Sequence, residues 1–179
     1  MSLLDDIARA YPFCPRCRAP MAVRTVGGRG RPVCPECGFV QFLNPAPGAG
    51  VILRRGETVC LVERRFPPRQ GQWTLPTGFV EWEEDVEETA VRETREETGL
   101  EVRLTRLFAV HSGILPPDQP VLVVFYEAEE IGGRLQAGDD AARAGFFALD
   151  QLPGRIAFAA HRKVLGALGA DLAERGGRP

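Results

Sequence analysis

Three glutamates near the middle of the chain could form a metal site. Glu93, Glu96 and Glu97 stand three and four residues apart, a spacing that places their side chains on one face of a helix. Neighbouring carboxylates repel one another, and acids in the last turn of a helix oppose its dipole, so the cluster calls for a compensating cation. Carboxylate oxygens are ligands that Mg²⁺ and Mn²⁺ prefer. The alternative is a solvated acidic face balanced by Arg92 and Arg95.

The segment that carries these glutamates, residues 84–98, has the start and stop signals of a helix. Asp85 followed three residues later by Glu88 resembles a capping box, and Gly99 is a typical helix stop. Small or apolar residues recur at every fourth position and define an inward-facing stripe: Val86, Ala90 and Thr94. The sequence therefore predicts a helix with one buried face and one acidic face.

Four of the five cysteines form a second candidate metal site. They are arranged as two Cys-x-x-Cys pairs separated by sixteen residues: Cys14, Cys17, Cys34 and Cys37. This spacing is typical of a closed, structural four-cysteine Zn²⁺ site, and Gly38 suits the tight turn after the second pair. A redox role for the two pairs is the alternative. Cys60 stands alone in a strand-like run and is interpreted as a buried, non-reactive residue.

Residues 78–100 read GFVEWEEDVEETAVRETREETGL and resemble the Nudix box. The box consists of Gly, five residues, Glu, seven residues, and then Arg-Glu-aliphatic-x-Glu-Glu-x-Gly-aliphatic, and each fixed residue falls at its place. Thr94 departs from the pattern, because the family usually has an aliphatic residue there. Thr77 also differs, since many members have a second glycine at that position.

The resemblance implies a role for each matching residue. The direct metal-binding carboxylates of the family match Glu93, Glu96 and Glu97. Glu84 matches a carboxylate that reaches a metal through water, and a backbone carbonyl near Gly78 matches a further ligand. Arg92 matches an arginine that pairs with acids of the loop and positions the metal ligands. In the implied reaction, Mg²⁺ ions bridge a diphosphate and activate a water, which attacks one phosphorus without a covalent intermediate.

The general base of this reaction has two possible sources. Family members supply it from the Nudix helix or from a later loop, and Asp140 is the favoured candidate here, ahead of Asp139. A solvated turn after Gly138 would give the same pattern.

The expected substrate follows from the combination of a four-cysteine ribbon, Asn44-Pro45 and a Nudix box. This arrangement is similar to the NADH pyrophosphatase branch and to a related group acting on ADP-ribose and FAD. The NADH branch carries a Ser-Gln-Pro-Trp-Pro-Phe-Pro-like element, whereas residues 111–117 read HSGILPP. We therefore expect hydrolysis of ADP-ribose or FAD with release of AMP. NADH cleavage, RNA-cap removal and a non-catalytic nucleotide- or nucleic-acid-binding module are the alternatives.

Several further residues could contact the substrate. Arg64, Arg65 and Arg69 could clamp phosphate, although a solvated hairpin would look the same. Aromatic candidates for stacking against a base or flavin are Trp73, Phe66, Phe79 and Trp82, and aromatics at strand ends are more often core or rim residues. His111 and His161 fit no nucleophile pattern and are interpreted as surface or packing residues.

Hydrophobic patterns predict an α/β (α+β) fold, which the resemblance refines to a Nudix-type α/β/α sandwich with a mixed sheet. The predicted strands cover residues 51–53, 58–63, 72–75, 102–110, 121–129 and 146–149, and a last helix covers residues 155–174. Residues 44–48 are predicted to be a linker and residues 113–120 a proline-rich loop. The predicted organisation is an N-terminal segment 1–12, a zinc ribbon 13–43, a Nudix domain 44–174 and a tail 175–179.

Composition bears on the partners and the cellular location of the protein. The chain has 179 residues and a net charge of -2, and only one of its 22 basic residues, Lys163, is not arginine. We interpret the arginine excess first as a genomic bias, so a nucleic-acid partner is not expected. The start of the chain does not resemble a secretory signal and no apolar run is long enough for a membrane span, which predicts a cytoplasmic protein. The family resemblance also fits a homodimer.

Overall fold

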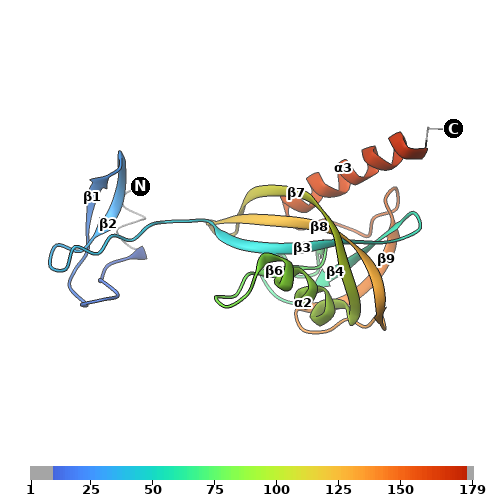
Figure 1. Ribbon diagram of the computed structural model, residues 1–179, viewed down its shortest axis with the longest axis horizontal. Coiled ribbons are helices and arrows are strands. Elements are labelled where there is room, and N and C mark those ends of the chain that lie inside the picture. The colour runs from blue at the N-terminus through green and yellow to red at the C-terminus, as the bar shows by residue number, and fades with distance from the viewer. Residues whose placement is uncertain (1–9, 177–179) are drawn as a thin grey trace. The chain divides into compact units, whose positions relative to one another are not determined.

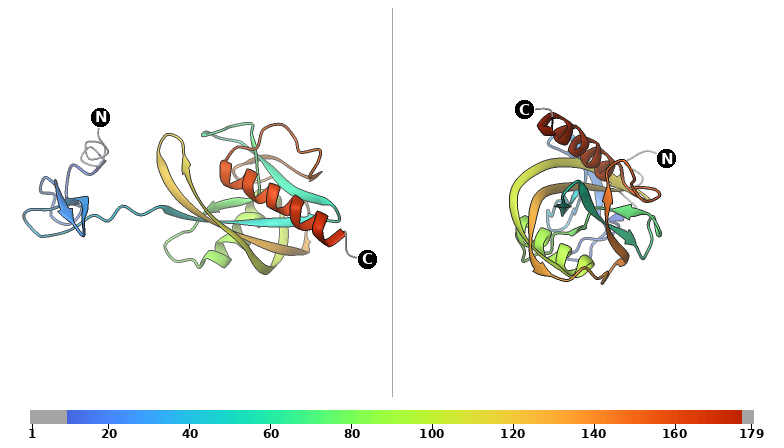
Figure 2. Two further views of the ribbon diagram at one scale, coloured as in Figure 1. Left: turned by 90° about the horizontal axis from the view of Figure 1, so that it is seen from above. Right: turned by 90° about the vertical axis from the view of Figure 1, so that its right-hand side faces the viewer.

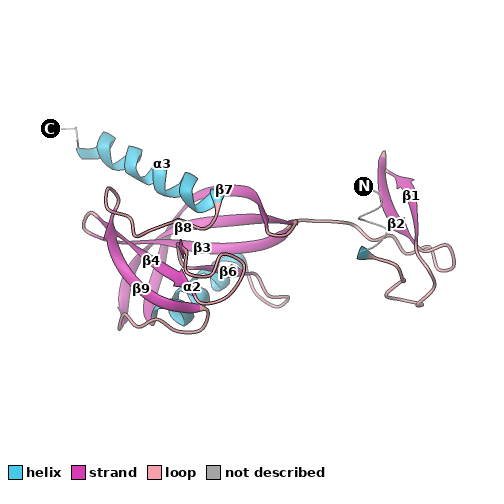
Figure 3. Ribbon diagram, turned by 180° about the vertical axis from the view of Figure 1, so that it is seen from behind, coloured by secondary structure: helices cyan, strands magenta, loops and turns pink. Residues whose placement is uncertain are grey.

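The computed structural model describes residues 10–176, so the predicted segment 1–12 and the predicted tail lie largely outside it. The chain divides into two compact units, Met1–Asn44 and Pro45–Pro179, which are described separately. The smaller unit contains one antiparallel hairpin, β1 (Ala22–Val26) and β2 (Arg29–Val33), shown with the other strands in Figure 3. Gly27 and Gly28 form its turn with φ of 57° and 74°, the left-handed backbone that tight hairpin turns need.

The larger unit is built on a mixed sheet (Figure 1). Its strands are β3 (Ala46–Arg55), β4 (Thr58–Arg64), β5 (Trp73–Thr74), β6 (Thr77–Phe79), β7 (Leu100–Leu115), β8 (Gln119–Gly133) and β9 (Ala141–Ala148). The central order is β5-β4-β3-β8-β7, with β6 paired to β3 and β9 paired to β4. β3 and β8 run parallel and the other pairs are antiparallel, which confirms the predicted mixed sheet.

Two helices cover the sheet from opposite sides, α2 (Val86–Thr98) and α3 (Ala159–Gly176) (Figure 1). The central strand β3 is buried on both faces: Ile52 belongs to the core beneath α3, whereas Val51 and Leu53 belong to the core beneath α2. Strands β7 and β8 curve so that one end of each lies beside α2 (Figure 2). The predicted α/β/α sandwich is therefore confirmed.

Two predicted irregular segments are regular in the structure. The predicted loop 113–120 is wrong for most of its length, because Gly113–Leu115 pairs with Gln119–Val121 and only residues 116–118 form the turn. The predicted linker 44–48 is wrong from Ala46 onward, where β3 begins. Pro47 lacks an N–H, but its carbonyl still accepts a hydrogen bond from Val80, so the proline is tolerated inside the strand.

Candidate active site

Helix α2, which carries the glutamates, is capped at both ends. Asp85 and Glu88 form the predicted capping box, in which the Asp85 N–H donates to Glu88 Oε2 at 3.0 Å. Gly99 adopts a left-handed φ of 69°, and its N–H donates to the Arg95 carbonyl. The inward stripe is present as well, since Ala90 and Thr94 are fully buried. The helix begins two residues later than predicted.

Glu97 is the buried member of the glutamate cluster. It is 5% exposed, and its Oε2 accepts a hydrogen bond from the Thr77 N–H at 2.9 Å, which ties α2 to β6. Burial raises the Glu97 pKa to about 8, aided by the nearby Glu93 charge and opposed by the Thr77 N–H. A buried carboxylate among other carboxylates is an unfavourable arrangement that a bound cation would relieve.

Glu93 lies directly against the backbone of β6 at Gly78. A Cβ atom at Gly78 would fall 1.9 Å from the Glu93 carboxyl group, so only glycine leaves room for this contact. Burial raises the Glu93 pKa, and the Arg92 guanidinium opposes that shift. Gly78 therefore provides the space in which Glu93 lies beside the loop backbone.

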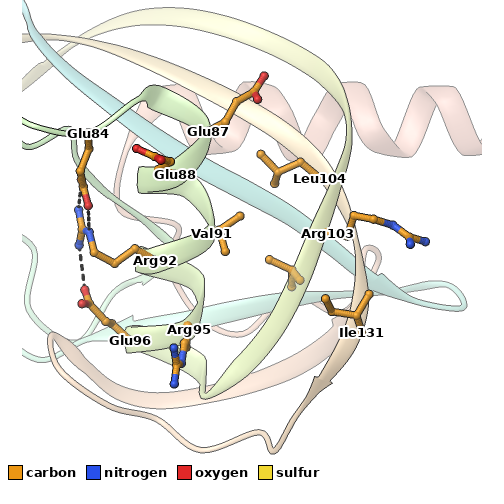
Figure 4. Close-up of a pocket in the computed structure, with 11 residues that line it drawn as sticks. Glu84, Glu87, Glu88, Val91, Arg92, Arg95, Glu96, Arg103, Leu104 and Ile131 are labelled. Atoms are coloured by element: carbon orange, nitrogen blue, oxygen red, sulfur yellow. Dashed lines mark hydrogen bonds and ion pairs between the residues drawn. The ribbon is translucent and has the colours of Figure 1, made fainter.

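Arg92 connects the acids of the helix with an acid of the preceding loop (Figure 4). Its guanidinium donates to both oxygens of Glu84, to Glu93 Oε1 at 2.8 Å and to Glu96 Oε2 at 2.8 Å. The guanidinium also donates to the Phe79 carbonyl at 3.2 Å. The arginine, together with the Thr89 hydroxyl, lowers the Glu84 pKa to about 2. The pairing of Arg92 with a loop acid is thus present in the structure.

A cavity of about 400 Å³ opens beside Glu93 and Glu97. Asp139 and Asp140 reach it from the loop before β9, and Arg64 reaches it from the end of β4. Glu96, Glu84 and Arg92 instead line a separate groove beside α2, to which strands β7 and β8 also contribute residues (Figure 4). Glu93 and Glu97 therefore line the cavity. Glu96 lines the other groove and is connected to Glu93 through Arg92.

This set of groups fits a divalent cation. The donors facing the cavity are carboxylate oxygens, with the Gly78 backbone next to them, and these are hard ligands of the kind that Mg²⁺ takes. Burial raises the pKa values of Glu93 and Glu97, and neighbouring carboxylates add to both shifts.

The predicted substrate-binding residues have different surroundings. Arg64 lines the cavity, its Nε donates to the Pro68 carbonyl and its guanidinium lies 5.2 Å from the Phe158 ring centroid. Arg65 anchors the loop of Asp140 instead: its N–H donates to the Asp140 carbonyl at 2.8 Å, and its Nη2 donates to the Ala141 carbonyl at 2.7 Å. Arg65 is therefore placed to hold the loop of Asp139 and Asp140 in position.

Trp73 belongs to the hydrophobic core. It is 6% exposed and its ring packs edge-on against Phe147, with 4.9 Å between centroids. Little of the indole is left for a substrate, so the interpretation of Trp73 as a stacking residue is corrected to a packing role. Of the other aromatic candidates, Phe79 lines the cavity and Trp82 is 97% exposed.

His161 of α3 is a cavity residue that sequence reasoning assigned only to surface or packing. It is buried, its Nδ1 accepts a hydrogen bond from the Leu75 N–H at 3.2 Å, and it lines the same cavity as Glu97. Burial lowers the His161 pKa to about 3, aided by the charge of Arg64. Its proximity to the glutamates depends on α3 packing over the sheet, which no local motif signals.

The four paired cysteines converge in the smaller unit. Their sulfur atoms all lie within 4.8 Å of one another, and none of them is in a disulfide. Tetrahedral Zn²⁺ with Zn–S bonds of about 2.3 Å separates its sulfurs by roughly 3.8 Å, close to the 3.6 Å and 3.4 Å of the two nearest pairs. Cys60 is fully buried in the other unit and burial raises its pKa to about 12, which agrees with a packing role.

The two cysteine loops have the same backbone design. The N–H of Cys14 donates to the Ala19 carbonyl, and the N–H of Cys34 donates to the Phe39 carbonyl. Each loop contains one left-handed residue after its second cysteine, Arg18 in the first loop and Gly38 in the second. The repeated geometry fits a pair of metal-binding turns facing one ion.

Comparison with known proteins agrees with this fold. The NUDIX domain model matches residues 44–168. The chain is 40% identical to the ADP-ribose pyrophosphatase of Methanocaldococcus jannaschii over 127 residues, which cover 69% of this chain and 73% of that protein. It is 35% identical to the NAD-capped RNA hydrolase NudC of Chromobacterium violaceum over 84% of this chain, and spans 55% of that relative.

Solved structures extend the agreement to three dimensions. A NUDIX hydrolase from Nitrosomonas europaea superposes with a TM-score of 0.77 at 30% identity, covering 87% of this chain and 88% of that one. The relatives and the solved structure that match this chain are hydrolases by name. The chain belongs to the Nudix family and is a Nudix hydrolase with pyrophosphatase activity. Among the helices within residues 10–176, none is long and apolar enough to span a membrane.

Proposed function

We propose that the protein is a Mg²⁺-dependent pyrophosphatase that cleaves ADP-ribose or FAD and releases AMP; Mn²⁺ could replace Mg²⁺. The observation that carries the proposal is the placement of Glu93 and Glu97 on one cavity wall, facing Asp140 and Arg64. Support for an ADP-ribose substrate comes from the pyrophosphatase relative, which matches over more than two thirds of both chains.

The residues that would hold the metal are Glu93, Glu96 and Glu97, with the Gly78 carbonyl and, through water, Glu84. A bound Mg²⁺ would supply positive charge to the diphosphate oxygens and make a water molecule more acidic. The chain prepares this site before any ligand arrives, because Arg92 orients Glu84, Glu93 and Glu96 while the Thr77 N–H orients Glu97.

The protein groups then have separate tasks in hydrolysis. Asp140 accepts a proton from the attacking water, whose oxygen forms a bond to one phosphorus of the diphosphate. The bond between that phosphorus and the bridging oxygen breaks, and the second phosphate leaves with the bridging oxygen. Arg64 contacts the phosphate charge as the leaving oxygen becomes negative. Arg65 fixes the Asp140 carbonyl, which keeps the base loop beside the cavity.

The test is product analysis with a panel of ADP-ribose, FAD, NADH and a nucleoside triphosphate in Mg²⁺. We expect AMP from ADP-ribose or FAD, and we expect Glu97→Gln to reduce kcat by about 10³-fold, since removal of one group that stabilises transition-state charge typically costs 10² to 10³ or more. Glu57→Gln is the matched control, because Glu57 is an exposed glutamate of the turn between β3 and β4. Equal turnover by the two variants would contradict the assignment of Glu97.

A second candidate is removal of a nucleotide cap from RNA. The match to the NudC protein of Chromobacterium violaceum covers 153 residues, more than the larger unit contains, so it reaches into the four-cysteine unit. Because residues 111–117 lack the element of the NADH branch, we rank this candidate second. A kcat/KM for NAD-capped RNA that exceeds the values for ADP-ribose and FAD would reverse the order.

We further propose that the four cysteines bind structural Zn²⁺ and that the protein forms a homodimer. Support for the zinc is the convergence of the sulfurs, and support for the dimer is a set of exposed apolar side chains on strand β7, at one end of the central strand order: Leu107, Val110 and Ile114. Light scattering on purified protein tests the dimer. A monomer mass at micromolar concentration would contradict it.

A further inference from the structure

The two units of the chain differ sharply in charge. Residues 10–44 contain five arginines and one acid, namely Arg16, Arg18, Arg24, Arg29, Arg31 and Glu36. Residues 45–179 contain 16 basic and 21 acidic residues. Met1–Asn44 as a whole contain six arginines and three acids. A genomic preference for arginine explains the choice of arginine over lysine, but it does not explain why residues 10–44 contain a single acid. The five arginines of residues 10–44 exceed the one acid by four charges, and four thiolates around one Zn²⁺, with two net negative charges, would cancel only half of that excess.

The register of the hairpin gathers three of these arginines on one face. Arg24 of β1 lies directly opposite Arg31 of β2, so both side chains project from the same side of the hairpin. Arg29 precedes Arg31 by two residues and shares that side. Like charges placed directly opposite each other destabilise a hairpin. An anionic ligand would relieve this repulsion.

An aromatic ring borders the arginine face. Phe42 is 53% exposed, and the Arg31 guanidinium lies 4.5 Å from the centroid of its ring. Arg31 Nε also donates to the Val26 carbonyl, which holds the guanidinium in this position. The unit therefore presents positive charge and a flat apolar ring side by side. Phosphate binding by arginine combined with base stacking on an aromatic ring is how proteins bind single-stranded nucleic acid.

We propose that the hairpin face formed by Arg24, Arg29, Arg31 and Phe42 binds single-stranded nucleic acid. The arginines contact backbone phosphates, and an unstacked base lies against the Phe42 ring. A duplex keeps its bases stacked within the helix and offers none to this ring. The proposal replaces the expectation that the protein has no nucleic-acid partner. It is independent of which diphosphate the larger unit cleaves, because binding is measured without turnover.

The test measures fluorescence anisotropy of a labelled RNA of about 20 nucleotides, with the full-length protein at about 50 mM salt and without Mg²⁺. Single-stranded DNA of the same sequence and duplex RNA are the comparison probes. We expect binding to both single strands and much weaker binding to the duplex. Similar affinities for RNA and DNA indicate that phosphates and bases suffice, and a preference for RNA indicates an additional contact to the 2′-hydroxyl. Either result supports the proposed face.

Two kinds of variant separate charge from stacking. The triple variant R24A/R29A/R31A is expected to bind at least 10-fold more weakly and to lower the salt slope of log K by about 2, since each phosphate contact on a single strand contributes about 0.7. Phe42→Ala is expected to weaken binding about 10-fold with the salt slope unchanged. The variant R24K/R29K/R31K should keep the salt slope. Zinc content and circular dichroism confirm that each variant is folded.

The matched control is R103A/R134A/R162A, which removes three exposed arginines from the larger unit. Its affinity should equal that of the unmodified protein. No anisotropy change at 50 mM salt would overturn the proposal, as would equal losses in the control and hairpin variants. Equal affinity for duplex RNA, or full affinity in Phe42→Ala, would show a general attraction to polyanions and would overturn recognition of single strands.

Discussion

The two units of this protein hold their functional groups together by different means. In the smaller unit, the few buried residues include Cys14 and Cys34, two members of the sulfur cluster itself, and the proposed zinc supplies what a core would otherwise provide. In the larger unit, the hydrophobic core between β3 and α2 holds in place the helix that carries the carboxylates. The proposed zinc would position the cysteines of the smaller unit, whereas hydrophobic packing positions the carboxylates of the larger unit.

Removal of zinc is expected to have the largest effect, and it should affect the smaller unit alone. Because binding of structural Zn²⁺ contributes roughly 10–16 kcal/mol in small domains, Cys34→Ser is expected to unfold the smaller unit and leave the larger one folded. Amide NMR spectra should lose dispersion only for residues of the smaller unit, and AMP release from ADP-ribose should persist. Metal analysis of the unmodified protein should give one equivalent of zinc. Less than about half an equivalent from non-chelating buffer would count against the site.

Gly78→Ala tests whether the carboxylate cluster depends on the backbone of the larger unit. The new methyl group would meet the Glu93 carboxyl group, which must move, so we expect kcat to fall by about 100-fold, as displacement of a positioned group by an ångström can cause. The control is Gly166→Ala on α3, where a methyl group meets open space. That change should leave kcat unaltered and stabilise the helix by up to about 1 kcal/mol. Full activity in Gly78→Ala would show that Glu93 need not contact this backbone.

The buried His161 makes the stability of the larger unit depend on pH. Its folded pKa of about 3 lies below the usual value of 6.5, so the unfolded state binds a proton first as pH falls. The free energy of unfolding should therefore decrease between pH 6.5 and pH 3, by about 1.4 kcal/mol per pH unit from this group.

His161→Asn should remove this slope, because an asparagine oxygen can still accept the Leu75 N–H and does not titrate in this range. Urea unfolding of the variant and the unmodified protein at pH 7, 6 and 5 measures the difference. His111→Asn is the control at the other histidine of the chain. An unchanged slope in His161→Asn would indicate that other groups cause the pH dependence.

The smallest expected effect concerns the residue that departs from the family pattern. Thr94 is fully buried, and its hydroxyl donates to the Ala90 carbonyl at 2.7 Å, within the helix. Thr94→Val restores an aliphatic residue of similar volume, and the carbonyl keeps its helical partner, so we expect a change in unfolding free energy of less than about 1 kcal/mol with kcat unchanged. Thermal unfolding and AMP release measure both. A large loss of activity would mean that the hydroxyl affects the glutamate face.

Sequence alone was sufficient for features that depend on short-range spacing. Helix α2 and its caps follow from residues three or four positions apart, and each pair of cysteines lies in a local turn of repeated design. The stripe of Ala90 and Thr94 is likewise a local pattern. Such features depend on backbone geometry that neighbouring residues impose on one another, so tertiary contacts did not alter them.

Other features were decided by contacts between distant parts of the chain. The extent of β7 and β8 across the predicted loop depends on their pairing with each other, which local proline content does not reveal. Trp73 is covered because β9 brings Phe147 against it, and His161 reaches the cavity because α3 packs over the sheet. The glutamates are on one helix, yet only the position of the cavity separates Glu93 and Glu97 from Glu96. Periodicity determines which side chains lie together on an element, whereas burial depends on what packs against that element.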